Sequence, residues 1–264
     1  STTSGSATIS FVAPVNNGGS AITGYTITSS PAGAVCTLDA NTTSFACTGL
    51  TDGTPYTYTV RAVNAVGNST AVTTAALTTQ RAASAPAIIS ATTGDTKATI
   101  TFSGAVTNGS TITSYTVQAY DSTDTALTGL TCTVTTSAAG GSCEVSGLTN
   151  GSSYTFRAIT NSTANSAAVS STVSIPTAAI IPAKAPDAPT GLEVTAGTGK
   201  ITVSWQEPAS NGSTILSYSV QAYDAAGNAV VGAICTVTAP ALTCDVSTNL
   251  LPANNYTFKA TATS

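Results

Sequence analysis

The stretch ITSYTVQAYDSTDTALTGLTCTV runs from Ile112 to Val134, and ILSYSVQAYDAAGNAVVGAICTV repeats it from Ile215 to Val237. Each copy opens with alternating apolar and polar residues, passes through a turn, and resumes the alternation up to a cysteine. Alternation at every second position is typical of a half-buried β-strand. The chain therefore carries the same strand, turn and cysteine twice, which indicates a tandem repeat.

Comparing the whole chain with itself reveals three copies of one unit. A Gly/Asn-rich turn precedes one tyrosine in each copy, namely Tyr25, Tyr115 and Tyr218. A strand of the type ATISF, ATITF or KITVSW lies ahead of each turn, and a strand of the type YTYTV, YTFRA or YTFKA follows later. Short alternating strands in units of about 100 residues, without a helical period, predict antiparallel β-sandwiches. We therefore predict an all-β chain of three immunoglobulin-like units over residues 1–80, 81–177 and 178–264.

The repeated residues resemble the fibronectin type III family. The buried aromatic position of that family is matched by Phe11, Phe102 and Trp205, and its third-strand tyrosine by Tyr25, Tyr115 and Tyr218. The Leu-x5-Tyr signature of its tyrosine corner is matched by Leu50–Tyr56, Leu148–Tyr154 and Leu250–Tyr256. The resemblance covers essentially the whole chain and implies the fold, while the sandwich itself hosts many unrelated roles.

Both terminal units look about one strand short in this alignment. The first unit lacks a counterpart of residues 85–91, and the third lacks a counterpart of residues 71–79. One interpretation is a window within a longer array. The other is strand exchange, in which a neighbouring subunit completes the open sheet, because an unpaired strand edge is a template for another chain.

Six cysteines fall two to a unit, as Cys36 with Cys47, Cys132 with Cys143 and Cys235 with Cys244. One pair at the same place in each repeat predicts three local disulfides. A metal site is the alternative, but the chain has no histidine and no CxxC spacing. Disulfides persist in oxidising compartments, so we predict an extracellular or cell-surface location.

Composition excludes several classes of function. Only 7% of residues are charged, the net charge is −4 and no histidine is present. Nucleic acid requires a basic face, and a membrane span requires about 18 consecutive apolar residues; the sequence offers neither. Without histidine or a spare thiol, the Ser-His-Asp and Cys-His nucleophile arrangements cannot form. Asp121 and Asp124 lack EF-hand spacing and indicate a solvated turn. We predict no enzymatic activity, no cofactor and no metal.

Contact with partners is predicted at the Asn/Gly turns and at the loops after the corner strand. The candidate residues are Asn16, Asn17, Asn64, Asn68, Asn108, Asn161 and Asn211. A second candidate surface, for acidic glycans, is the row formed by Arg61, Arg157 and Lys259, which we expect to occupy the same outward-facing position in all three units; a solvated strand face is the alternative. Asn-x-Ser/Thr sequons, which permit glycosylation, occur at Asn41, Asn68, Asn108, Asn150, Asn161, Asn211 and Asn255.

These observations predict a non-enzymatic extracellular structural or adhesive protein, as part of a surface fibre, a surface layer or a long adhesin. Its partners would be further protein subunits, joined by strand exchange, or surface glycans. A virion fibre or decoration protein and a non-catalytic spacer of a secreted carbohydrate-active enzyme are the alternatives.

Overall fold

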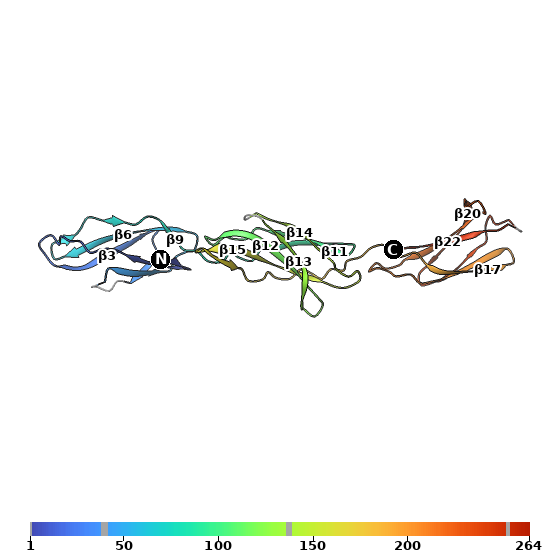
Figure 1. The fold of residues 1–264 in the computed structure, drawn as a ribbon, viewed down its shortest axis with the longest axis horizontal. Coiled ribbons are helices and arrows are strands. Elements are labelled where there is room, and N and C mark those ends of the chain that lie inside the picture. The colour runs from blue at the N-terminus through green and yellow to red at the C-terminus, as the bar shows by residue number, and fades with distance from the viewer. Residues whose placement is uncertain (1, 38–41, 136–138, 252–253) are drawn as a thin grey trace.

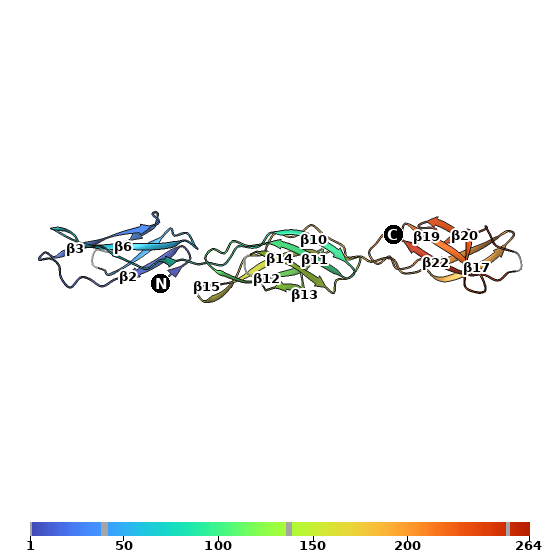
Figure 2. The same ribbon diagram turned by 90° about the horizontal axis from the view of Figure 1, so that it is seen from above.

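The computed structural model describes residues 2–37, 42–135, 139–251 and 254–264, in which all regular structure is β-strand. Three β-sandwich units follow one another along one long axis, without packing side by side (Figure 1). The view from above shows the same row (Figure 2). The predicted all-β tandem architecture is therefore confirmed. The exact unit boundaries stay a prediction, because the linkers contact both neighbouring units.

In its described part, the second unit has seven strands in two antiparallel sheets. They are β10 (Ile88–Gly94), β11 (Lys97–Ser103), β12 (Thr111–Tyr120), β13 (Ala126–Val134), β14 (Gly140–Ser146), β15 (Thr155–Ala164) and β16 (Ala167–Ser170). One sheet has the order β10-β11-β14, and the other has the order β13-β12-β15-β16. Beyond β16 the chain continues to hydrogen-bond along β15 as far as Ile180, whose N–H donates to the Tyr154 carbonyl at 2.9 Å. The side of β15 that faces away from β12 is thereby hydrogen-bonded along its length.

The third unit repeats this plan with six strands in the residues that the structure describes. They are β17 (Thr190–Gly197), β18 (Lys200–Gln206), β19 (Ser217–Tyr223), β20 (Ala229–Thr238), β21 (Thr243–Val246) and β22 (Thr257–Thr263). The sheets have the orders β17-β18-β21 and β20-β19-β22. Strand β22 therefore forms the edge of its sheet among the described residues.

Among its described residues the first unit has nine strands, and one of them departs from the plan. They are β1 (Thr2–Thr3), β2 (Ser6–Ser10), β3 (Ile22–Ser30), β4 (Val35–Thr37), β5 (Ser44–Thr48), β6 (Pro55–Asn64), β7 (Gly67–Asn68), β8 (Val72–Thr73) and β9 (Leu77–Thr78). The sheets are β1-β2-β5-β4 and β3-β6-β7, with β8 and β9 also pairing with β6. Strand β4 thus pairs with β5, whereas its counterparts β13 and β20 pair with β12 and β19.

Loop length explains why β4 changes sheet. Tyr115 and Cys132 are 17 positions apart (132 − 115), whereas Tyr25 and Cys36 are only 11 apart (36 − 25). The shorter connection leaves too few residues to turn and run back along β3 as a long strand, so the chain crosses to the edge of the other sheet.

Each unit has its own core, built by alternation and closed by a tyrosine corner. Residues along β11 alternate between buried and less buried, with Phe102 at 2% exposure inside. The corner tyrosines accept a hydrogen bond from a backbone N–H five residues earlier, as shown by Thr51 to Tyr56, Thr149 to Tyr154 and Leu251 to Tyr256 at 3.2, 3.0 and 2.8 Å. The predicted Leu-x5-Tyr feature therefore forms in all three units.

The duplicated QAYD segment proves to be a structural clamp. The Gln118 side chain is part-buried, and its Nε2 donates hydrogen bonds to the Leu127 carbonyl at 2.7 Å and the Leu130 carbonyl at 3.3 Å. These bonds lie where the β12–β13 pairing shifts register. Gln221 bonds Val230 and Ala233 in the same way. Because carbonyls left over at a bulge need donors, one glutamine per unit secures the hairpin.

The aspartate of the same segment closes the following turn. Asp121 Oδ1 accepts the N–H groups of Thr125 and Thr123, each at 2.9 Å. These hydrogen bonds hold the pKa of Asp121 below its ordinary value, and the bond from the Thr125 N–H contributes most. Asp224 is arranged alike through Asn228 and Ala226. The repeated aspartate therefore closes the same turn in the second and third units.

Three disulfides join Cys36–Cys47, Cys132–Cys143 and Cys235–Cys244, each within one unit. Cys132 on β13 and Cys143 on β14 belong to different sheets, so their bridge fastens the two sheets together. The bridge of the third unit links β20 to β21 in the same manner. In the first unit, Cys36 and Cys47 are direct cross-strand partners within one sheet, because β4 has changed sheet.

Removing the bridge of the second unit is expected to destabilise that unit alone. Replacing Cys132 and Cys143 together with serine should lower its unfolding free energy by just under ~3 kcal/mol, since the bridge closes a loop slightly shorter than 15 residues. Hydrogen exchange resolved by unit measures the change, and the untouched third unit is the internal control. Equal protection of the second unit with and without the bridge would contradict the expectation.

Candidate functional site

The Asn/Gly turn of the second unit does not face solvent but receives the first unit. Residues 51–53, 79–82 and 107–110 meet there, and we call this contact the first joint. The Gly53 N–H donates to the Thr79 carbonyl at 2.9 Å, and Asn108 Nδ2 donates to the Ala82 carbonyl at 2.9 Å. The linker is thus fastened at one end to the unit it leaves and at the other to the unit it enters.

Two glycines bring the backbones of the two units into direct contact at this joint. Gly109 has φ +80°, and a Cβ placed on it would lie 2.8 Å from both the Gly53 nitrogen and the Thr79 oxygen. A Cβ on Gly53 would lie 2.9 Å from the Gly109 nitrogen. Only glycine permits this approach together with the left-handed conformation.

A second joint repeats the arrangement between the second and third units, at residues 149–151, 182–185 and 210–213. The Gly151 N–H donates to the Pro182 carbonyl at 2.9 Å, and Asn211 Nδ2 donates to the Ala185 carbonyl at 3.1 Å. A Cβ on Gly212 would lie 2.6 Å from the Gly151 nitrogen. The same geometry occurs twice, so the joint belongs to the repeat.

The turn between β15 and β16 adds a further contact across the first joint. The Asn165 N–H donates to Gln80 Oε1 at 2.7 Å, and Asn165 Oδ1 accepts Thr2 Oγ1 at 3.3 Å. One residue of the second unit therefore touches both the linker and the first strand of the first unit.

Asp52 supplies the charged part of the first joint. Its carboxylate accepts the Ser4 hydroxyl at 2.8 Å and the Gly5 N–H at 3.0 Å, and lies 3.5 Å from Arg81 Nε. Burial alone raises the pKa of Asp52, but the hydrogen bonds from Gly5 and Ser4 and the charge of Arg81 outweigh burial and lower it. The second joint has neutral Asn150 at this position.

The first joint is therefore expected to weaken in acid. The folded protein has the lower pKa at Asp52, so its stabilising contribution is present above the unfolded value near pH 4 and is lost as pH falls through the folded value. Hydrogen exchange at Gly5 and residues 79–82, measured from pH 6 to pH 2.5, should show this loss. Asp52→Asn should remove the pH dependence at this joint, and an unchanged dependence in that variant would contradict the assignment.

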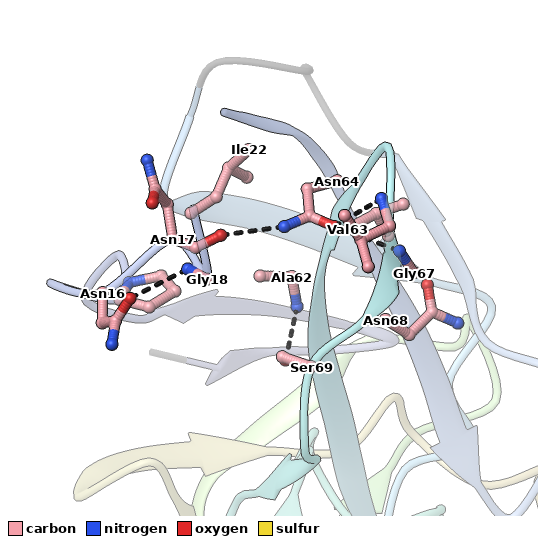
Figure 3. A pocket seen from close by; sticks show the side chains of 12 residues that line it. Asn16, Asn17, Gly18, Ile22, Ala62, Val63, Asn64, Gly67, Asn68 and Ser69 are labelled. Atoms are coloured by element: carbon pink, nitrogen blue, oxygen red, sulfur yellow. Dashed lines mark hydrogen bonds between the residues drawn. The ribbon is translucent and has the colours of Figure 1, made fainter. Parts of the chain in front are cut away.

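The equivalent turn of the first unit lies at the far end of the row and surrounds a hollow of about 430 Å³ (Figure 3). Asn64 projects across it, donating from Nδ2 to the Asn17 carbonyl at 2.8 Å and accepting the Val66 N–H at 2.9 Å. Asn16 accepts the Gly18 N–H at 2.9 Å. Asn68 also lines this tip. The structure thus gathers four of the predicted contact residues here and places Asn108 and Asn211 inside the joints.

Asn161 lies elsewhere than predicted. The sequence placed it in a loop, but it belongs to β15, where Nδ2 donates to Ser114 and Thr116 hydroxyls at 3.0 and 3.1 Å. The reason is that β15 runs on to Ala164 before it turns. The joint turns at 51–53 and 149–151 were missed, although the Thr-Asp/Asn-Gly sequence repeated before the corner tyrosines of the first two units was a signal for them.

The sequons divide by exposure. Asn68 and Asn255 are exposed. The Nδ2 atoms of Asn108, Asn150, Asn161 and Asn211 donate hydrogen bonds within the fold. Asn41 lies outside the described residues. Glycosylation stays a prediction, and Asn68 and Asn255 are its best placed acceptors.

The predicted basic row is wrong in its register. Arg157 pairs across the sheet with Gln118, and Lys259 with Gln221, but Arg61 pairs with Thr26. Thr26 follows its unit's tyrosine by one residue, whereas each glutamine follows its tyrosine by three, so Arg61 stands two positions along the strand. The error arose because the first unit reads YTYTVR where the second reads YTFR.

The two cations at equivalent positions, Arg157 and Lys259, each lie over a tyrosine ring. Arg157 lies 4.7 Å from the ring centroid of Tyr120 and contacts both oxygens of Asp124 at 2.6 and 2.8 Å. Lys259 lies 4.4 Å from the ring of Tyr223. These cations cover the tyrosine of the duplicated motif.

No chemical centre is visible in the part of the chain that the structure describes. Among those residues no three His, Cys, Asp or Glu side chains come together as metal ligands, and the cysteines are all in disulfides. No helix there is long and apolar enough to cross a membrane. The features that the described residues do form are the two joints and the hollow at the tip of the first unit.

Fold and joints together define a tandem β-sandwich protein, in which disulfide-bonded units are joined end to end. The chain belongs to the fibronectin type III family, whose domain profile matches residues 1–78, 84–175 and 187–264. A search of curated proteins finds no match. Among solved structures 287 chains match. One, the FN1–FN3 domains of chicken CNTN1, is 16% identical over 100% of this chain and 90% of that one, with a TM-score of 0.41.

Proposed function

We propose that this chain is a non-enzymatic structural element of an extracellular assembly, holding its units in line as part of a surface fibre, a surface layer or a long adhesin. The observation that carries the proposal is the pair of glycine-to-glycine joints. A flexible linker would leave the units free to bend, whereas direct backbone contact with hydrogen bonds on both sides resists bending. Such joints suit a protein that spans distance.

Three features support an extracellular structural or adhesive role. Each unit carries a disulfide, and disulfides persist where the surroundings are oxidising. The surface carries few charges, with only 7% charged residues in the chain. Fibronectin type III domains in tandem are typically extracellular structural or adhesive modules.

Stiffness in solution is the first test. Small-angle X-ray scattering and electron microscopy of the purified chain should give straight particles with a narrow distribution of end-to-end length. A broad distribution, with particles bent at either joint, would overturn the structural role.

Location and assembly are the second test. Thiol labelling of native material should find the cysteines oxidised, and electron microscopy should find the chain in a repeating surface assembly. Reduced cysteines, or a chain that is found only as a monomer attached to a secreted catalytic domain, would overturn the proposal.

A further inference from the structure

Both joints are built from Asp-Gly and Asn-Gly pairs. The pairs that meet are Asp52–Gly53 with Asn108–Gly109 at the first joint, and Asn150–Gly151 with Asn211–Gly212 at the second. Glycine is required at these contacts because a Cβ would collide with the backbone of the facing unit. The missing Cβ also has a chemical consequence, since it leaves the glycine nitrogen unhindered beside the side-chain carbonyl of the preceding residue.

An asparagine that precedes glycine can cyclise. The backbone nitrogen of the glycine bonds to Cγ of the asparagine, the Cγ–Nδ2 bond breaks, and ammonia leaves with the proton that the glycine nitrogen gives up. Water then opens the succinimide ring at one of its two carbonyls, its hydroxyl going to the carbon and its proton to the nitrogen. The product is aspartate, or isoaspartate with one more carbon in the main chain. Because the two groups are neighbours, the step is intramolecular, and asparagine is accordingly a thermolabile residue.

Asn150 is the joint asparagine whose amide is best prepared for this reaction. Its Oδ1 accepts the Thr96 N–H at 2.9 Å, and its Nδ2 donates to Asp95 Oδ1 at 2.7 Å. A donor on the carbonyl oxygen stabilises the negative charge that develops there when a nucleophile attacks Cγ. Both bonds lie within the second unit and do not depend on the joint. The amides of Asn108 and Asn211 are bonded to the linkers instead.

The closed joint fixes the attacking nitrogen. The Gly151 N–H donates to the Pro182 carbonyl at 2.9 Å, and a Cβ on Gly212 would lie only 2.6 Å from the same nitrogen. Ring closure requires this nitrogen to turn towards Cγ of Asn150. It cannot turn while it is bonded to the linker and packed against the third unit, so opening of the joint must come first.

The product does not fit the closed joint. A carboxylate at position 150 would place an oxygen beside Asp95 Oδ1, where the Asn150 Nδ2 donor now lies at 2.7 Å. Two like charges at that distance repel each other. The first joint does have an aspartate at this place, but Asp52 meets the Ser4 hydroxyl and the Arg81 cation. Isoaspartate would in addition lengthen the main chain within the contact.

We propose that Asn150 is a self-modification site, at which succinimide formation with Gly151 makes opening of the second joint irreversible. The closed joint preserves the asparagine, whereas a joint that is held open loses ammonia and does not close again. The inference goes beyond the structural role proposed above, because it concerns the lifetime of the joint. It depends only on the geometry of the second joint.

The test follows Asn150 in the 264-residue chain during incubation in heavy-oxygen water at mildly alkaline pH. Each new carboxyl takes up the heavy oxygen, and mass spectrometry of proteolytic peptides locates it. The synthetic peptide LTNGSSY, identical to residues 148–154, is the unprotected reference. Asn150 should react roughly tenfold or more slowly in the folded chain, since attack requires the open state and tenfold corresponds to about 1.4 kcal/mol of closure.

Matched glycine variants connect the rate to the joint. The methyl group of Gly212→Ala would lie 2.6 Å from the Gly151 nitrogen and 2.7 Å from the Pro182 oxygen. This variant should open the joint and speed the reaction of Asn150 by roughly tenfold or more. Gly227→Ala is the control, because Gly227 has φ +83° against +84° for Gly212 but a Cβ there meets nothing within 4 Å. It should leave the rate unchanged.

Asn150→Asp tests the last step, since it carries the product from the start and should bend the chain at the second joint in small-angle scattering. Three results would overturn the inference: equal rates in the folded chain and the peptide, equal rates in Gly212→Ala and Gly227→Ala, or an Asn150→Asp chain as straight as the wild type. A straight wild-type chain that gives any of these results would keep the structural role and lose only this site.

Discussion

Gly109→Ala is expected to open the first joint and bend the row of units there. The new methyl group would lie 2.8 Å from the Gly53 nitrogen and the Thr79 oxygen. Both are backbone atoms that cannot rotate aside, so the two units must separate at this contact. Scattering should report a shorter maximum dimension with a broader distribution, and a spin-label pair across the joint should report scattered distances.

Gly129→Ala is the matched control for this change. Gly129 has φ +83°, close to the +80° of Gly109, but a Cβ there meets nothing within 4 Å. Both variants carry the cost of alanine in a left-handed conformation, about 1–2 kcal/mol. Only Gly109→Ala should change the shape. A straight Gly109→Ala rod would show that the glycine contact does not set the alignment.

Phe102→Ala is expected to destabilise the second unit by about 3–5 kcal/mol, the usual cost of deleting a large aromatic side chain from a packed core. Phe102 is 2% exposed and packs against Tyr115 between the two sheets. Because a domain is stable by only about 5–15 kcal/mol, the second unit should come close to unfolding. Hydrogen exchange resolved by unit provides the measurement.

Phe11→Ala, the equivalent change in the first unit, is expected to cost distinctly less. Phe11 is only half-buried and lines an open apolar hollow of the first unit, so less apolar area is lost and water can enter the space. Equal losses at the two positions would mean that the linker segment, with its buried Ala83 and Pro86, contributes little to core burial in the second unit.

Both predictions test the linker between the first and second units. Residues 81–88 of the linker pack against the second unit, where Ala83 and Pro86 are buried. The same linker begins at the first joint, where Gly109 contacts the Thr79 carbonyl. Loosening the joint should therefore raise hydrogen exchange along residues 81–88 as well. We therefore expect packing of the linker on the second unit and alignment of the first two units to change together.

The sequence by itself determined the sandwich, the number of units and the disulfide partners. Alternation in β11, the Leu148–Tyr154 corner and one cysteine pair per repeat are local patterns, and each can be read without knowing what packs on them. The Gln118 clamp belongs here in part, because its duplication marked it as important, although its hydrogen-bond partners were not foreseen.

Only the tertiary structure decided where those units touch. Gly53 and Gly109 read as separate turns, and nothing local reveals that their backbones meet, because the contact depends on how two folded units are oriented. The sheet change of β4 and the register of Arg61 depend likewise on loop length and strand pairing, where two residues more or fewer move a side chain along the strand. Local patterns fix which residues face a core, while distances between distant segments are set only when the chain has closed around them.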